Sequence, residues 1–141
     1  MAKEIRANRF IFEDENGKPR ASLGLSNDGR ALFLRDTNGR HRIGLVLSEY
    51  GTCLSLHEGL AKVSLQVGKE GPSLFLIDEN GKPRVTLRVA EERPEKGPGM
   101  MELLDENGKP RVRLWIAKEG PEKGQGMELR DENGWNIWSA P

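Results

Sequence analysis

The sequence predicts an all-β protein: an antiparallel meander of about six hairpin repeats that forms a β-prism or barrel-like array, which oligomerisation would complete. Three observations predict it. Apolar and polar residues alternate in steps of two, this pattern recurs along the chain, and a DENG-like turn divides each recurrence. Such alternation is typical of half-buried strands, and Asn-Gly is a strong hairpin signal. Gly or Pro interrupts every stretch long enough for a helix.

The repeat is an apolar alternation, a turn and a second apolar alternation. In chain order its copies read FIFEDENGKPRASLGL, LFLRDTNGRHRIGLVL, LSLHEGLAKVSLQV, LFLIDENGKPRVTLRV, MELLDENGKPRVRLWI and MELRDENGWNIWSA. The first residues of successive copies are 22, 22, 20, 27 and 26 positions apart, so the connections between copies are longer in the second half of the chain. We therefore divide the single domain, 1–141, into units near 8–29, 30–51, 52–71, 72–99, 100–126 and 127–141.

Each copy contains two strands, and the pairing register follows from its turn. A two-residue turn at Asn80-Gly81 places Leu76 opposite Val85 and Leu74 opposite Leu87, so that both apolar sets share one face. A three-residue loop would break this match. The third copy is two residues shorter, and an even deletion also keeps both strands facing the same way.

The connections between copies obey the same rule. A turn at Glu70-Gly71 places Val67 opposite Leu74 and continues the apolar face. Within its own hairpin Pro83 is expected opposite Asp78, where its missing N–H breaks no bond of that pair. On the outward face, Glu102 of the fifth copy lies opposite Arg113. A parallel β-solenoid is the alternative, but it does not require this mirror register at both kinds of turn.

The apolar face of such a meander needs a partner surface, because burying each Leu or Val contributes roughly 1.5 to 3 kcal/mol. A three-sided prism, a closed barrel or packing against further copies of the chain would provide it. The outward face is also partly apolar, so we expect a homo-oligomer, with a trimer as one arrangement. The outward apolar residues are Ile11, Phe33, Val46, Phe75, Ile77, Leu104 and Trp115.

Composition excludes several functions. The 141 residues carry 22 basic and 22 acidic side chains, mixed along the chain, so no nucleic-acid or anionic membrane partner is expected. One cysteine allows no intrachain disulfide. No apolar run reaches the roughly 18 residues of a membrane span, and MAKEIRANRF lacks the apolar stretch of a secretory signal. We therefore expect a cytoplasmic protein.

No catalytic, cofactor or metal site is expected. Aligning Asn16-Gly17 with a calcium loop puts Phe12 where the first carboxylate should be, so DENG is interpreted as turn chemistry. His41 and His57 form no zinc-ligand pair, and Cys53 has no matched histidine. The chain is interpreted as a non-enzymatic structural or protein-interaction repeat protein that self-associates.

Two near-identical loops, near 91–99 and 118–126, are the best candidates for a contact surface. Together with Trp115, they contribute Pro94, Glu95, Lys96, Pro121, Glu122 and Lys123. Loops on a regular scaffold often carry binding, so a module that uses them to bind a glycan, another ligand or a protein partner is the alternative function. Trp135, Ile137 and Trp138 form a terminal cluster that we interpret as a cap on the core.

The segments IRANRFIFEDENGKPRASLGL, DENGKPRV and IWSAP resemble a group of uncharacterised bacterial proteins built from the same hairpin repeat. That resemblance covers nearly the whole chain and implies no function. The tail LRDENGWNIWSA is locally similar to repeats of the monocot mannose-binding lectins, which implies a twelve-stranded β-prism. The lectins' Gln-x-Asp-x-Asn-x-Val-x-Tyr sugar motif is missing, and the only tyrosine is Tyr50.

Overall fold

The protein is described from a computed structural model that covers all residues except 1–3, 5, 27–28, 90–98, 118–123 and 141. The described residues form twelve strands and no helix. In chain order the strands are β1 (Arg9–Glu13), β2 (Pro19–Ser26), β3 (Gly29–Arg35), β4 (His41–Ser48), β5 (Gly51–Glu58), β6 (Ala61–Gly68), β7 (Gly71–Ile77), β8 (Pro83–Arg88), β9 (Gly99–Leu104), β10 (Pro110–Ala117), β11 (Gly124–Arg130) and β12 (Asn136–Ala140).

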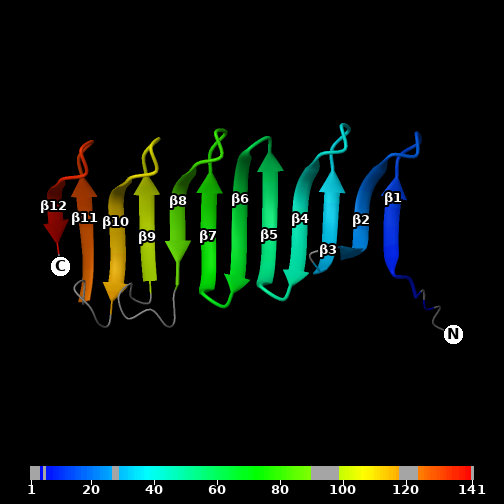
Figure 1. The fold of residues 1–141 in the computed structure, drawn as a ribbon, viewed down its shortest axis with the longest axis horizontal. Coiled ribbons are helices and arrows are strands. Elements are labelled where there is room, and N and C mark those ends of the chain that lie inside the picture. Colours follow the sequence, from blue (N-terminus) through cyan, green and yellow to red (C-terminus); the bar gives the residue numbers. More distant parts are fainter. Residues whose placement is uncertain (1–3, 5, 27–28, 90–98, 118–123, 141) are drawn as a thin grey trace.

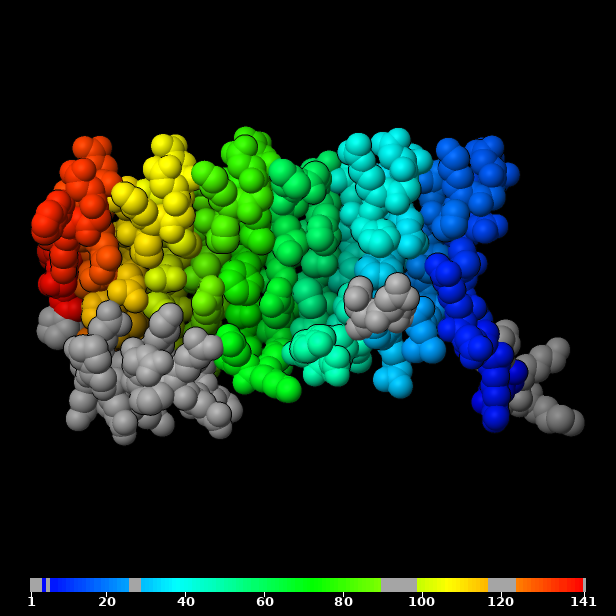
Figure 2. Space-filling view, viewed as in Figure 1, coloured from blue at the N-terminus to red at the C-terminus, as the bar shows by residue number. Residues whose placement is uncertain are grey.

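All twelve strands belong to one sheet, in which each strand lies beside its neighbours in sequence. Every pairing is antiparallel. The strands form a single layer with β1 and β12 at its opposite ends (Figure 1). The space-filling view shows the same order: the colour changes from blue to red along the long axis, so neighbouring segments of the chain lie side by side (Figure 2). The predicted antiparallel meander is thus confirmed and the parallel solenoid is wrong, while the sheet of a single chain is open.

The predicted hairpin register is confirmed, although the predicted turn is wrong. Leu76 pairs with Val85, and Leu74 with Leu87. The turn, however, is a three-residue loop, because the Asp78 amide donates to the Lys82 carbonyl at 2.9 Å.

Positive φ within this loop is confined to Gly81, at 76°. The Gly81 amide donates to the Asp78 carbonyl at 2.9 Å, which closes a type I turn followed by a left-handed glycine. A two-residue Asn-Gly turn of type I′ would also require a positive φ at Asn80, and no described residue other than glycine has one.

A β-bulge next to the loop restores the register that three residues would otherwise shift. Ile77 pairs with Pro83 and Leu76 with Val85, which leaves Arg84 as the extra residue of β8. The predicted pairing of Pro83 with Asp78 is therefore wrong. The four other DENG-like hairpins have a register shift at the same place.

The third hairpin has one loop residue fewer than the DENG-like hairpins, and it has no bulge residue. Glu58 pairs with Ala61 around the two-residue turn Gly59-Leu60, and β5 pairs with β6 without a shift. Gly59, at φ 62°, occupies the first turn position, as a type II′ turn requires. This explains why the third copy is shorter by two residues and still keeps its faces.

At the opposite edge of the sheet the predicted register is wrong by two residues. Leu74 pairs with Leu65 instead of Val67, and Gly71 pairs with Gly68. Gly71, at φ 91°, follows the turn instead of forming part of it. A shift of two leaves every side chain on its predicted face.

One face of the sheet, here called the leucine face, carries two uninterrupted rows of aligned residues. The row nearer the DENG turns is Phe12, Ala21, Leu34, Ile43, Leu56, Val63, Leu76, Val85, Leu103, Val112, Leu129 and Trp138. The second row is Phe10, Leu23, Leu32, Leu45, Leu54, Leu65, Leu74, Leu87, Met101, Leu114, Met127 and Ala140. None of these positions carries a charge.

The opposite face, here called the mixed face, has a central row of small, aromatic and charged residues. That row is Ile11, Ser22, Phe33, Gly44, Ser55, Ser64, Phe75, Thr86, Glu102, Arg113, Glu128 and Ser139. Small residues lie beside large ones: Ser64 pairs with Phe75, and a Cβ on Gly44 would lie 3.3 Å from the Phe33 ring. The large side chains therefore cover the small ones.

The sequence predicted that the leucine face would be buried and the mixed face exposed, and the structure of the single chain shows the reverse. Ser64 is fully buried and Thr86 is 3% exposed, both on the mixed face, whereas Leu87 on the leucine face is 44% exposed. The described residues include a single buried hydrophobic one, Ala31, which also lies on the mixed face. The leucine set was expected to face inward, but no described strand or turn of the single chain packs over it.

Candidate functional site

The leucine face is the candidate functional site. In its central rows the exposed fraction of the side chain is 62% at Phe12, 50% at Leu65 and 49% at Leu23. The whole chain exposes 10592 Å², whereas a folded monomer of 15.8 kDa exposes about 7,300 Å². Monomeric proteins rarely expose a contiguous apolar patch larger than a few hundred Å². This face can therefore bind another apolar surface, and it carries no chemistry of its own.

The leucine face continues toward the sheet edge away from the DENG turns. Leu25, Leu47, Val67 and Ile116 extend it there, and they are 67%, 45%, 56% and 60% exposed. Arg30, which is exposed and pairs with Leu47, introduces a charge at this border. Charge thus appears at the rim of the apolar surface and not within its two central rows.

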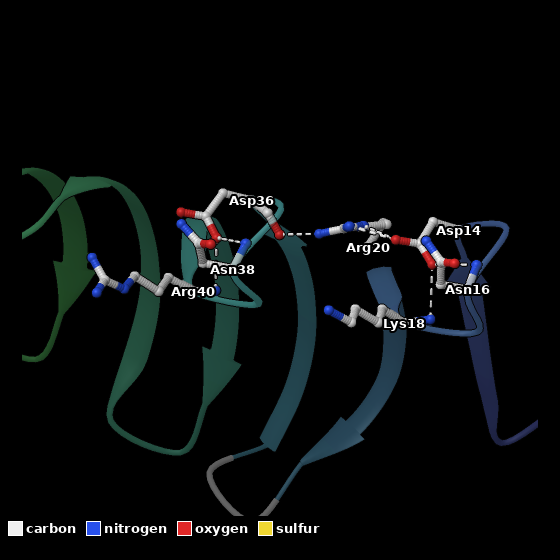
Figure 3. A network of polar contacts seen from close by, with 7 residues as sticks. All are labelled: Asp14, Asn16, Lys18, Arg20, Asp36, Asn38 and Arg40. Atoms are coloured by element: carbon white, nitrogen blue, oxygen red, sulfur yellow. Dashed lines mark hydrogen bonds and ion pairs between the residues drawn. The ribbon is translucent and has the colours of Figure 1, made fainter.

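The opposite edge of the sheet is organised by the aspartate that begins each DENG turn. One Asp14 oxygen accepts hydrogen bonds from the Asn16 and Lys18 amides at 2.9 and 3.0 Å, and the other accepts one from Arg20 Nε at 2.9 Å. Arg20 also donates to the main-chain carbonyl of Asp36 in the next hairpin (Figure 3). A single arginine thus connects two successive turns.

This arrangement recurs along the edge. Asp36, Asp78, Asp105 and Asp131 each accept hydrogen bonds from the amides two and four residues later. The bulge residues Arg42, Arg84 and Arg111 form ion pairs with Asp36, Asp78 and Asp105. Contacts to the following turn come from Arg42 to the His57 carbonyl (3.2 Å), Arg111 to the Glu132 carbonyl (2.9 Å) and Lys82 Nζ to the Glu106 carbonyl (2.7 Å).

These contacts give the DENGKPR pattern a structural role. The aspartate orders the loop, the glycine takes the positive φ, and the arginine in the bulge returns to the aspartate. The Lys82 amide bond, followed by the Arg84 and Asn80 bonds, holds the pKa of Asp78 below its ordinary value. The pKa values of Asp14, Asp36 and Asp105 are lowered by the equivalent bonds. No group of residues suited to holding a metal occurs in the part of the chain that the structure describes.

The histidines and the cysteine lie apart from the leucine face. His41 stacks on Phe33 with ring centroids 4.4 Å apart, and His57 Nε2 lies 2.9 Å from Ser55 Oγ. Burial, with nearby positive charge, lowers the pKa of both histidines. Cys53 Sγ lies 3.5 Å from the Ser64 hydroxyl, a weak contact on the mixed face.

An ion-pair network, which the sequence revealed only in part, occupies the mixed face across β9, β10 and β11. Arg113 lies between Glu102, at 3.3 Å, and Glu128, at 3.2 Å. Arg130 also pairs with Glu128, at 2.8 Å. The expected pairing of Glu102 with Arg113 is confirmed. Glu128 could have been predicted as a second partner of Arg113 in the same way, because it has the opposite charge and lies opposite Arg113 on the next strand.

The predicted contact surface lies largely outside the described residues. Of its seven positions, Trp115 alone is described, and it packs over Gly126 on the mixed face, where a Cβ would lie 2.4 Å from the ring. The other six are Pro94, Glu95, Lys96, Pro121, Glu122 and Lys123. The structure therefore brings Trp115 into the sheet and away from the leucine face.

The terminal cluster ends the leucine face. Trp138 pairs with Leu129 in the last hairpin, just as Val85 pairs with Leu76 in the fourth. This is the position that the sequence predicted. Trp138 is 48% exposed, and Trp135 and Ile137 are 73% and 65% exposed. In a single chain the cluster therefore ends an open apolar row instead of closing a core.

Within the described ranges, no helix is long and apolar enough to cross a membrane. Neither a scan against protein-family models nor a search of the curated proteins finds a match to this chain.

Proposed function

We propose that this chain is a non-enzymatic structural protein that self-associates, with its leucine face covered by further copies of itself. The observation that carries this proposal is the burial pattern: the central rows of the leucine face are uncharged and contain no buried residue, while Ser22, Ser64 and Thr86 on the other face are buried. A surface of this kind contributes most of its stabilisation only when a second apolar surface covers it.

The available area supports a stable interface. Twelve strands spaced about 4.8 Å apart and about 20 Å long present a face on the order of 1,000 Å². Packing two such faces together buries on the order of 2,000 Å² in total, which lies at the upper end of standard interfaces and the lower end of obligate ones.

The chemistry of the face favours a second copy over an unrelated partner. Its two rows repeat the same branched aliphatic residues at the spacing of the strands, so two copies present matching ridges to each other. Net charge is zero, so no long-range repulsion keeps copies apart. A face-to-face dimer is the simplest assembly, and a trimer in which three sheets enclose one core also covers the face.

One substitution on each face tests the proposal. Leu65→Lys places an ammonium group in the middle of the leucine face, where covering it would bury an unpaired charge. Gln66→Lys adds the same charge on the mixed face and serves as the matched control. We expect sedimentation velocity to show that Leu65→Lys loses the species in which leucine faces pack together, whereas Gln66→Lys keeps the wild-type profile. Both variants should keep a β-sheet circular dichroism spectrum. An undiminished assembly of Leu65→Lys would contradict the proposal.

A further inference from the structure

The sheet has two free edges, and these provide a second surface that is independent of the leucine face. Within the described residues, β1 pairs only with β2 and β12 only with β11. The outer side of each edge strand therefore presents main-chain N–H and C=O groups to solvent, as edge strands generally do.

Neither edge has the protection that edge strands usually carry at their centres. β1 and β12 lack lysine and proline, and the charges of β1 lie at its ends, Arg9 and Glu13. At the centres are Ile11 and Phe12, which are 44% and 62% exposed, and Trp138, which is 48% exposed. An apolar edge without such protection is a template for another strand.

The two edges match each other in direction and in face. Consecutive strands alternate in direction, so β12 of one copy and β1 of the next would run antiparallel, like every pair within the sheet. Placing Trp138 opposite Phe12 of the next copy continues one row of the leucine face. The same register puts Ala140 opposite Phe10, which continues the other row.

This register also fits the mixed face. Ser139 would lie opposite Ile11, which repeats the small-beside-large pairing of Ser22 with Ile11 and with Phe33 inside the chain. Neither Ser139 nor Ile11 is charged, so the joint would bury no ion. The central rows of both faces would therefore continue from one copy into the next across the joint, with apolar residues on one face and a small residue beside a large one on the other.

We propose that copies of this chain join head to tail through β12 of one copy and β1 of the next, with Trp138 opposite Phe12 and Ser139 opposite Ile11. The two surfaces of this joint differ, so repetition leads to a ring if the rotation closes and to a filament if it does not. The joint extends the sheet sideways, whereas the proposed packing of leucine faces adds a second layer.

Engineered disulfides test the joint directly. In a Cys53→Ser background, Ile11→Cys combined with Ser139→Cys places two thiols at directly opposite positions, where Cβ atoms lie about 4.5–5.5 Å apart and a small adjustment allows a disulfide. After mild oxidation, a non-reducing denaturing gel should show a ladder of products with more than two chains. Each single-cysteine variant should give dimers at most.

A charge pair tests the register. Ile11→Lys with Ser139→Lys places like charges opposite each other, whereas Ile11→Lys with Ser139→Glu places opposite charges there. Sedimentation velocity should show the larger species lost in the first variant and retained in the second. Equal profiles would overturn the register.

Two results of the cross-linking would overturn the joint itself: a fast-migrating monomer, which would mean that one chain closes on itself, or uncross-linked monomer alone, which would mean that no second copy occupies the edge. Either result would leave the leucine-face test with Leu65→Lys unaffected, because the two experiments probe different surfaces.

Discussion

At the scale of single residues, the fold depends on a small set of turn positions that recur from hairpin to hairpin. The aspartate, glycine and arginine of DENGKPR have separate tasks: accepting loop amides, adopting positive φ and returning from the bulge to the aspartate. Four of the aspartates have a lowered pKa because the loop amides bond to the ionised carboxylate. Acid should therefore act on all of these turns together.

The pH dependence has a definite sign. A carboxylate with a lowered folded-state pKa stabilises the fold above its ordinary pKa of 3.8, and this stabilisation is lost as the pH falls through the lowered value. We expect the thermal unfolding midpoint to decline below about pH 6.5, because His41 and His57 have a lowered pKa in the folded state, and to fall further below about pH 4 as the aspartates lose their stabilisation. In Asp78→Asn this fall should be smaller. The exposed neighbour Glu79→Gln is the control, and an identical acid profile in Asp78→Asn would contradict the assignment.

The glycine of the loop gives a second prediction. Gly81 adopts φ 76°, and an added Cβ would meet only the Leu60 Cβ, at 4.0 Å, which is an ordinary contact. Gly81→Ala should therefore cost about 1–2 kcal/mol through the left-handed backbone alone. Gly99 also has space around it but does not require positive φ. Chemical denaturation should show little loss for Gly99→Ala. A loss as large as that of Gly81→Ala would mean that conformation is not the cause.

At the scale of the strands, the two faces should respond differently to protein concentration. Leu87 is exposed in a single chain and would be covered in the assembly, whereas Thr86 is buried on the mixed face in either state. Leu87→Ala should therefore lower stability by an amount that grows with protein concentration, because association stabilises the wild type more.

Thr86→Ala removes the hydroxyl that donates to Glu102 at 3.2 Å, and its cost should not depend on concentration. Thermal unfolding of both variants and the wild type from low to high micromolar concentration would check this pair. Parallel behaviour of the two variants would contradict the assignment of the faces.

Much of the strand arrangement could be predicted, because two local features determine the face of each side chain: the apolar–polar alternation, and whether the number of residues between two paired positions is even or odd. Leu74 and Leu76 were placed opposite the correct partners even though the turn was predicted wrongly. A loop one residue longer and a bulge with one extra residue compensate each other, so parity survives an error in the turn. The error at Glu70-Gly71 arose because a glycine can follow a turn as well as form one, and the letters alone do not distinguish the two positions.

At the scale of the whole molecule, periodicity does not determine what covers a face. Alternating apolar residues fit a barrel, a prism and an open sheet equally, since each buries or presents the same residues. In a single chain the sheet is open, and the residues best buried are the small polar ones of the mixed face. The sequence thus identified the residues of the leucine face but assigned them to a covered core, and it placed the contact surface in the two long loops and Trp115 instead.

The assembly proposed here explains this reversal. In the proposed assembly the leucine face would lie in the interior, and its residues would therefore be exposed only when one chain is considered alone. The outward apolar residues that suggested self-association in the sequence, such as Phe33 and Trp115, instead pack over glycines within the mixed face. From the sequence, packing against further copies was one of three ways to cover the leucine face, and the structure makes it the one that we propose.

The central claim is that further copies of the chain cover the leucine face. Sedimentation equilibrium of the wild-type protein at micromolar concentration tests it most directly. The predicted result is a mass of at least twice 15.8 kDa, which dissociates as the protein is diluted. A well-folded monomer of 15.8 kDa at every concentration would contradict it.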